Sequence, residues 1–193
     1  SEATTAIATT NASGIATSPN VRALGPLGPF LATASVAGVS IPASFTLTIT
    51  ADFDAPAARV WQLWADPRLL ERWWGPPTYP ATVVDHEFVA NGRVTYFMTG
   101  PEGQKHHGWW RVIAVEPPHA LEFEDGFADD SGEPNPELPT TVARVTITEQ
   151  PTGTRMVIAS TFTSLEAMEH LIAMGVEEGM AAALGQADAL LAT

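Results

Sequence analysis

The last thirty or so residues constrain the fold most, because they predict one long amphipathic helix from Thr163 to Thr193. Apolar side chains recur there at steps of three and four residues, which places them on one side of a helix. Thr163 and Glu166 have the spacing of a capping box, in which a hydroxyl and a carboxylate satisfy backbone N–H groups of the first turn. At about 1.5 Å per residue the helix is roughly 45 Å long, enough to cross a small domain. Its apolar side must be covered by the remainder of the chain.

Three glycines inside this segment are unusual for a helix. Gly175, Gly179 and Gly185 each cost about 1 kcal/mol relative to alanine in a helix interior. We therefore expect another part of the protein, or a ligand, to approach the helix backbone closely there. A packing helix with no further role is the alternative interpretation.

Alternating apolar and polar residues predict strands ahead of this helix. Residues 44–51 alternate strictly, as in an antiparallel strand with one buried face. Asp54 is a candidate N-cap for a short helix with Pro56 in its first turn, and Asp66 for a second helix, Pro67 to Trp74. The predicted order is one strand, two short helices, six strands and one long helix. The six strands are predicted at 81–90, 93–99, 105–115, 121–124, 142–149 and 155–162.

The dipeptide Asn91-Gly92 predicts a hairpin between the first two of these six strands. It is the strongest short-range signal for a two-residue turn, because both central residues of a type I′ turn need a positive φ. A two-residue turn also fixes the register. Asp85 would then lie opposite Met98, on the face that also carries Tyr96.

Charge and composition exclude several classes of partner. The formal net charge is −13, from 22 acidic residues against nine Lys and Arg. Such a surface repels nucleic acid and anionic lipid, and no run approaches the roughly 20 apolar residues of a membrane-spanning helix. The chain has no cysteine, and residues 1–20 lack a secretion signal, which together predict a cytoplasmic protein. We expect neither nucleic acid nor a membrane as partner.

Residues 1–44 predict an N-terminal arm, and residues 45–193 a single domain. The arm is rich in Ala, Thr, Ser, Gly and Pro and has almost no charge. Its part from Val21 to Ile41 is more apolar than a solvated linker, so we expect it to pack on its own domain or on a second subunit of a homodimer. A mobile tail is the alternative.

Several short motifs occur in an order that resembles a known family, the activator of heat-shock-protein-ninety ATPase family within the START-like (SRPBCC) superfamily. The resemblance covers about residues 45–192 and implies an α+β helix-grip fold, in which a curved antiparallel sheet wraps round a long C-terminal helix. Met180 departs from the pattern, since many relatives carry Trp there. The motifs are Phe53-Asp54-Ala55-Pro56, Val60-Trp61, Asp66-Pro67, Trp73-Trp74-Gly75-Pro76, Asn91-Gly92-Arg93, Val115-Glu116-Pro117-Pro118, Gly153-Thr154-Arg155-Met156 and Glu177-Glu178-Gly179-Met180.

The resemblance also implies a function. In helix-grip folds sheet and helix often do not fully meet, and the apolar cavity between them is a typical small-molecule site. We therefore expect non-enzymatic binding of a small hydrophobic or aromatic ligand, without a cofactor, in a stress-associated, ATPase-activator-like protein. Two alternatives stay open: a co-chaperone-like module that contacts a chaperone, and a cyclase- or hydrolase-like enzyme that uses a cavity carboxylate or histidine.

Residues suited to catalysis are few. His106 and His107 are adjacent on a predicted strand, so they point to opposite faces and cannot chelate one ion together. Glu122 and Glu124 share a face, but a solvated sheet face explains them more simply than acid–base catalysis does. Asp85 or Glu87, if it pointed into the cavity, would have a raised pKa and would be a candidate acid or ligand anchor. We expect no catalytic and no metal site.

Aromatic and apolar residues on the strands and helices around the predicted cavity are the candidate ligand-binding residues. Core packing is the simpler explanation for any single one of them. Release of a ligand would require movement of the lid near Trp73 to Pro77. The candidates are Trp73, Trp74, Tyr96, Met98, His107, Trp109, Phe123, Phe162, Met168 and Ile172.

Overall fold

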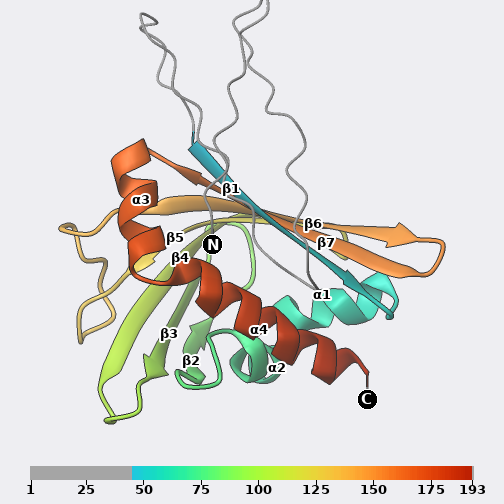
Figure 1. Ribbon diagram of the computed structural model, residues 1–193, viewed down its shortest axis with the longest axis horizontal. Coiled ribbons are helices and arrows are strands. Elements are labelled where there is room, and N and C mark those ends of the chain that lie inside the picture. The colour runs from blue at the N-terminus through green and yellow to red at the C-terminus, as the bar shows by residue number, and fades with distance from the viewer. Residues whose placement is uncertain (1–44, 193) are drawn as a thin grey trace, which may run out of the picture.

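A computed structural model describes residues 45–192, and its main feature is a seven-stranded antiparallel sheet that curves round the C-terminal helix (Figure 1). Strands β2 to β7 are neighbours in chain order, and β1 completes the sheet beside β7. This is the predicted α+β helix-grip architecture. The predicted arm, residues 1–44, lies outside the described residues. The strands are β1 (Phe45–Phe53), β2 (Ala81–His86), β3 (Arg93–Thr99), β4 (Lys105–Glu116), β5 (Ala120–Phe127), β6 (Thr141–Gln150) and β7 (Gly153–Phe162).

Two short helices connect β1 to β2, namely α1 (Ala57–Ala65) and α2 (Pro67–Trp73). The predicted start of α2 is confirmed, because the Asp66 carboxylate accepts a hydrogen bond from the backbone N–H of Arg68 at 2.8 Å. The predicted cap of α1 is wrong. Its N-cap is Pro56, in an extended conformation and without a side-chain cap. Asp54 lies too far ahead of the first helical turn to act as the N-cap of α1.

The predicted single C-terminal helix is two helices, α3 (Leu165–Ala173) and α4 (Val176–Leu191). Gly175 separates them with a φ of +85°, a left-handed conformation that ends an α-helix. Figure 1 shows α3 turned away from the direction of α4. The cap of α3 is Ser164 rather than Thr163, since the Ser164 hydroxyl accepts from the backbone N–H of Ala167 at 3.0 Å.

The glycines of this segment therefore have a different explanation from the expected one. Gly175 is needed for its positive φ. A Cβ on Gly185 would meet nothing within 4 Å, so the expected close approach to the backbone is wrong there. At Gly179 the nearest neighbour of an added Cβ is Pro76 at 3.9 Å, an ordinary van der Waals distance.

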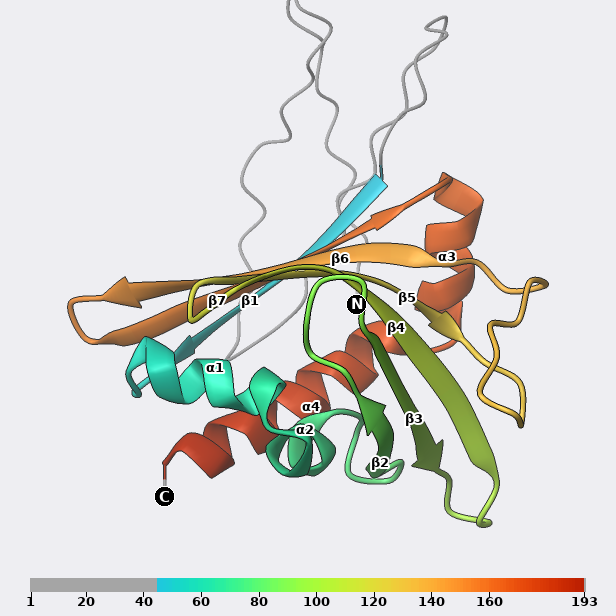
Figure 2. The ribbon, with the colours of Figure 1, turned by 180° about the vertical axis from the view of Figure 1, so that it is seen from behind.

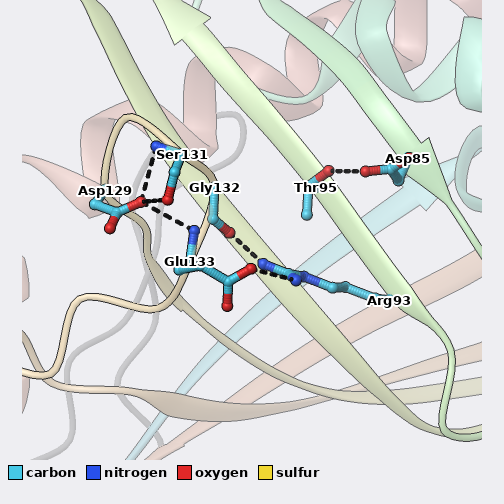
Figure 3. A network of polar contacts seen from close by, with 7 residues as sticks. All are labelled: Asp85, Arg93, Thr95, Asp129, Ser131, Gly132 and Glu133. Atoms are coloured by element: carbon cyan, nitrogen blue, oxygen red, sulfur yellow. Dashed lines mark hydrogen bonds and ion pairs between the residues drawn. The ribbon is translucent and has the colours of Figure 1, made fainter.

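The β2–β3 hairpin has a different register from the predicted one. Val83 pairs with Tyr96, and a bulge after Val83 places Asp85 opposite Thr95 instead of Met98. The Thr95 hydroxyl donates a hydrogen bond to the Asp85 carboxylate at 2.9 Å (Figure 3). Because side chains alternate along a strand, this pair lies on the face of β3 opposite Tyr96. Asp85 does not point into the interior.

The register differs because the connection between β2 and β3 is longer than two residues. β2 ends at His86, and the loop that follows is attached to β4: the Asn91 N–H donates to the Val112 carbonyl, and the Val112 N–H donates to the Gly92 carbonyl, each at 2.9 Å. A Cβ on Gly92 would collide with the carbonyl oxygen of Glu87. Asn91-Gly92 does lie in a tight turn, in which the Gly92 N–H donates to the Val89 carbonyl at 2.8 Å and Asn91 has a φ of +65°, but this turn is not a two-residue hairpin loop between β2 and β3.

The helices pack on the concave side of the sheet (Figures 1 and 2). α4 makes its close backbone contacts with α2, α1, α3 and β1, and α2 also packs against β2. Buried side chains from these layers form one continuous apolar core. No helix between residues 45 and 192 is long and apolar enough to cross a membrane.

Candidate functional site

An aromatic cluster occupies the interior that the sequence analysis assigns to a cavity. The rings of Trp74 and Trp110 are nearly perpendicular, with centroids 5.0 Å apart, and Trp110 stacks on Phe123 at 4.5 Å. Tyr96 and Trp64 complete the cluster, each with its ring centroid within about 6 Å of that of Trp110. Trp110 is fully buried, whereas Trp74 and Tyr96 keep 7% and 8% of their surface exposed. The space is therefore filled by rings rather than left as an open hollow.

The register of β3, β4 and β5 brings these rings together. Tyr96 lies opposite Gly108, whereas Trp110 lies opposite Val94, so alternation turns Tyr96 and Trp110 to the same face. Only glycine fits at position 108, because an added Cβ would lie 2.5 Å from the Cζ atom of the Tyr96 ring. The Tyr96 ring thus lies directly over the backbone of β4.

Two indole N–H groups in this cluster have no hydrogen-bond acceptor. The Nε1 atoms of Trp74 and Trp110 are buried and without a partner among the described residues. Neither makes a regular hydrogen bond to the Tyr96 hydroxyl, although both lie close enough to it to favour the ionised form of the phenol. Burial of the phenol and the nearby charge of Asp125 have a larger, opposite effect, so the pKa of Tyr96 is raised. Tyr96 is therefore a neutral phenol at physiological pH.

Two other buried tryptophans do have an acceptor for the indole N–H. Trp73 donates from Nε1 to the carbonyl of Leu63 at 2.9 Å, and Trp64 donates to the sulfur of Met156 at 3.2 Å. A buried donor without an acceptor costs about 1–3 kcal/mol. The two unpaired donors in one cluster are thus an exception that calls for an explanation.

Asp125 on β5 is a site residue that the sequence analysis missed. It lies opposite Trp110 and, by alternation, on the same face as Phe123. Its carboxylate accepts a hydrogen bond from the hydroxyl of Thr141. Burial of the carboxyl group raises its pKa to about 6. The sequence analysis expected Phe123 to face the interior. Because side chains two residues apart on a strand share a face, the same reasoning would have placed Asp125 in the interior.

The structure gathers most of the predicted binding residues on the concave side of the sheet. Two of them, Met98 and Ile172, are only partly buried and lie against the edge of the core. The buried ones are Trp73, Trp74, Tyr96, Phe123, Phe162 and Met168.

Two predicted residues, His107 and Trp109, lie on the opposite, outer face of the sheet. Trp109 pairs with Thr95 and donates from Nε1 to the carbonyl of Phe127 at 3.1 Å. His107 pairs with Phe97, and its ring contacts the Phe97 ring at 5.5 Å. They are not near the other candidates, because Trp110 and Gly108 take the inward positions of β4.

The outer face carries ordinary polar networks. Figure 3 shows the loop after β5 lying against β3, where Arg93 forms an ion pair with Glu133 at 2.9 Å. Glu122 and Glu124 pair with arginines of neighbouring strands, which confirms the interpretation of a solvated face. No group of three or more His, Cys, Asp or Glu in the described part of the chain is arranged to hold a metal ion.

A surface pocket of about 360 Å³ lies elsewhere, between the β1–α1 connection and the β6–β7 turn. None of its lining residues belongs to the aromatic cluster. They are Asp54, Ala55, Pro56, Glu149, Gln150 and Gly153.

A curved antiparallel sheet closed by a C-terminal helix, with a few polar groups inside an apolar interior, defines a protein of the START-like (SRPBCC) class. Residues 54–192 match the family described as activator of Hsp90 ATPase homolog 1-like protein, and the chain belongs to this family.

Solved structures agree with this assignment. A crystal structure of a protein from Mycobacterium smegmatis is 53% identical in sequence, covers 76% of this chain and 90% of its own, and has a TM-score of 0.71. An NMR structure of a protein from Arthrobacter aurescens is 52% identical in sequence, covers 76% of this chain and 86% of its own, and has a TM-score of 0.73. An NMR structure of a protein from Staphylococcus epidermidis is 28% identical in sequence, covers 76% of this chain and 88% of its own, and has a TM-score of 0.68. No curated protein matches the chain.

Proposed function

We propose that this protein binds a small, largely apolar or aromatic molecule in the interior between β3–β5 and α4, without catalysing a reaction on it. One observation carries the proposal: the polar groups of Trp74, Tyr96, Trp110 and Asp125 converge inside an otherwise apolar interior. Such groups lower the stability of a core that has only a packing role. Binding sites for small molecules, in contrast, combine apolar walls with a few polar groups.

The edge of this interior supports a route of entry. Met98, Ile172, Val176 and Met180 are partly buried and pack against the core. Methionine side chains are flexible and adapt to ligands of different shape. Ile172 and Val176 flank the break between α3 and α4, where the left-handed Gly175 interrupts the helical hydrogen bonding. Because the rings of the aromatic cluster already pack against one another, a ligand enters here by displacing these side chains and moving the rings apart.

The lid near Trp73 to Pro77 is a less suitable gate than this break. The Trp73 indole is hydrogen-bonded to Leu63, and Gln186 of α4 donates to the Gly75 carbonyl at 2.7 Å. Opening the lid would break these bonds, whereas side chains at the helix break are held by apolar contacts alone.

The chemistry of the interior favours binding over catalysis. The raised pKa of Tyr96 leaves it a hydrogen-bond donor at neutral pH rather than a base. His107 is on the outer face, and His106 is exposed. In the described part of the chain, the Asp125 carboxylate accepts a hydrogen bond from the Thr141 hydroxyl, and no histidine is hydrogen-bonded to it.

The proposal can be tested with N-phenyl-1-naphthylamine, a neutral dye whose fluorescence rises in apolar surroundings. We expect saturable binding of one dye per chain. Val176→Asp should weaken binding at least about tenfold, because a charge at the entry must be desolvated, while an acidic residue in the first turn of α4 is compatible with the helix. Glu149→Ala, in the surface pocket, is the control and should leave the affinity unchanged.

Equal affinity of the dye for wild type and Val176→Asp would contradict an interior site. Failure of the wild type to retain any apolar molecule in native mass spectrometry, together with binding to an Hsp90-type chaperone, would favour a chaperone-interacting module instead.

A further inference from the structure

We infer that the ligand carries a neutral acceptor oxygen of the carbonyl type, which accepts hydrogen bonds from Nε1 of both Trp74 and Trp110. This inference rests on the proposed function and names the chemical class of its ligand. It follows from the two unpaired donors and from the groups that surround them.

The two indoles come from different elements and meet in one small volume. Trp74 is the C-cap residue of α2, and Trp110 is in the middle of β4. Their rings are at 88° to each other, and both are tilted steeply against the Tyr96 ring, at 88° for Trp74 and 63° for Trp110. The Tyr96 hydroxyl lies near both N–H groups. The Tyr96 oxygen interacts with both indoles but is a regular hydrogen-bond partner of neither, so both N–H groups can still take an acceptor that a ligand supplies.

The chemistry of these donors selects the ligand. An indole N–H can only donate, so its partner must be an acceptor. A carbonyl oxygen has two lone pairs and can accept from both indoles at once. An ammonium group has no lone pair and would leave both donors unpaired.

Asp125 excludes a negatively charged acceptor. Its carboxyl group is on the same face as Trp110 and close enough to Tyr96 to raise the pKa of the phenol. A ligand carboxylate or phosphate placed between the indoles would be repelled by the ionised Asp125 in surroundings of low dielectric constant. A neutral carbonyl is not repelled in this way.

Two probes of nearly the same shape test the inference. 2-Acetylnaphthalene carries a ketone, and 2-isopropenylnaphthalene carries a CH₂ group in place of the ketone oxygen. We expect the ketone to bind roughly tenfold more tightly, the effect of about one net hydrogen bond. In ¹H–¹⁵N spectra, the indole N–H protons of Trp74 and Trp110 should move downfield with the ketone and not with the hydrocarbon.

Variants assign the preference to the two indoles. Trp74→Phe and Trp110→Phe should each reduce the preference for the ketone several-fold while the hydrocarbon binds as before. Trp109→Phe removes an indole from the outer face and is the matched control, so its preference for the ketone should equal that of wild type. If Trp110→Phe does not fold, the indole shifts of the wild-type protein decide the question.

The outcomes separate this inference from the proposed function. Equal affinity for both probes, or unchanged indole shifts with the ketone, would overturn the carbonyl inference and leave small-molecule binding intact. Failure of both probes and of the naphthylamine dye to bind would overturn both.

Discussion

Gln186 on α4 donates a hydrogen bond from Nε2 to the carbonyl oxygen of Gly75, at 2.7 Å. A longer contact of 3.4 Å joins the same Nε2 atom to the carbonyl of Trp73. Both carbonyls lie at the end of α2, where the last C=O groups of a helix have no partner within the helix. The C-terminal helix thus stabilises the end of α2 through one side chain, 111 residues away in sequence.

Gln186→Ala should lower the free energy of unfolding by about 1 kcal/mol, because it leaves a partly buried carbonyl without its donor. In a domain of this size the loss corresponds to a melting temperature about 2–4 °C lower. Thermal unfolding measures it, with Gln62→Ala, an exposed position on α1, as the control. Equal melting temperatures for the two variants would show that the bond to Gly75 contributes no net stability.

Two glycines of the C-terminal segment should respond to alanine in opposite directions. Gly185→Ala should raise the free energy of unfolding by about 1 kcal/mol, because the added Cβ meets nothing within 4 Å and alanine favours the helix. Gly175→Ala should lower it by about 1–2 kcal/mol, because φ is +85° there. Urea unfolding of both variants measures the two effects, and a change of the same sign in both would contradict the helix break at Gly175.

The helix break shows where sequence periodicity is insufficient. Ile172, Val176 and Met180 keep the four-residue spacing of one helix, although Gly175 lies between the first two in a left-handed conformation. A glycine tolerated in a helix and a glycine that ends a helix look the same in one sequence. The distinction depends on packing: α3 lies against β1 and β7, whereas α4 lies mainly against α2.

The candidate site shows a second limit. Alternation correctly predicts that Trp109 and Trp110 point to opposite faces, but it does not state which face is the inner one. That choice depends on pairing with β3, where Trp110 lies opposite the fully buried Val94. Asp125 was missed for a related reason, since a carboxylate near several acidic residues resembles a solvated face until its neighbours across the sheet are known.

Asp125 should make the folded protein less stable as the pH rises from about 4 to about 6. Its pKa is raised to about 6 in the folded protein from 3.8, so in this range the folded state holds a proton that the unfolded state has released. The stabilisation is complete below the unfolded value and is lost as the pH passes through the folded value. At neutral pH the penalty is about 3 kcal/mol, at roughly 1.4 kcal/mol for each pH unit between the two values.

Asp125→Asn should therefore be more stable than wild type at pH 7 and similar to it at pH 4. The asparagine oxygen can still accept the hydrogen bond from Thr141, so the change removes mainly the charge. Urea unfolding across this range measures the difference. Asp130→Asn in the exposed loop also removes one negative charge and should not be more stable than wild type at pH 7. A wild-type advantage at pH 7 would contradict a buried, destabilised carboxylate.

His86 should produce a pH dependence of the opposite sign. Its Nε2 atom lies 3.1 Å from the carbonyl oxygen of Trp64, and its ring stacks on Phe88 with centroids 5.0 Å apart. Burial lowers the pKa of His86 below 6.5, which favours the neutral imidazole. The unfolded state therefore binds a proton first as the pH falls, so the stability is complete above about 6.5 and decreases below it.

The His86 effect overlaps with that of Asp125 below pH 6, so it is best measured in the Asp125→Asn background. In that background the free energy of unfolding should decrease between pH 7.5 and pH 5, and His86→Gln should flatten the decrease because a neutral amide can donate to the Trp64 carbonyl at either pH. His119→Gln, on an exposed turn, should leave the slope unchanged. If His86→Gln and His119→Gln have the same slope, the half-buried imidazole of His86 is not the group that titrates, and its contact with Trp64 tolerates a charged ring.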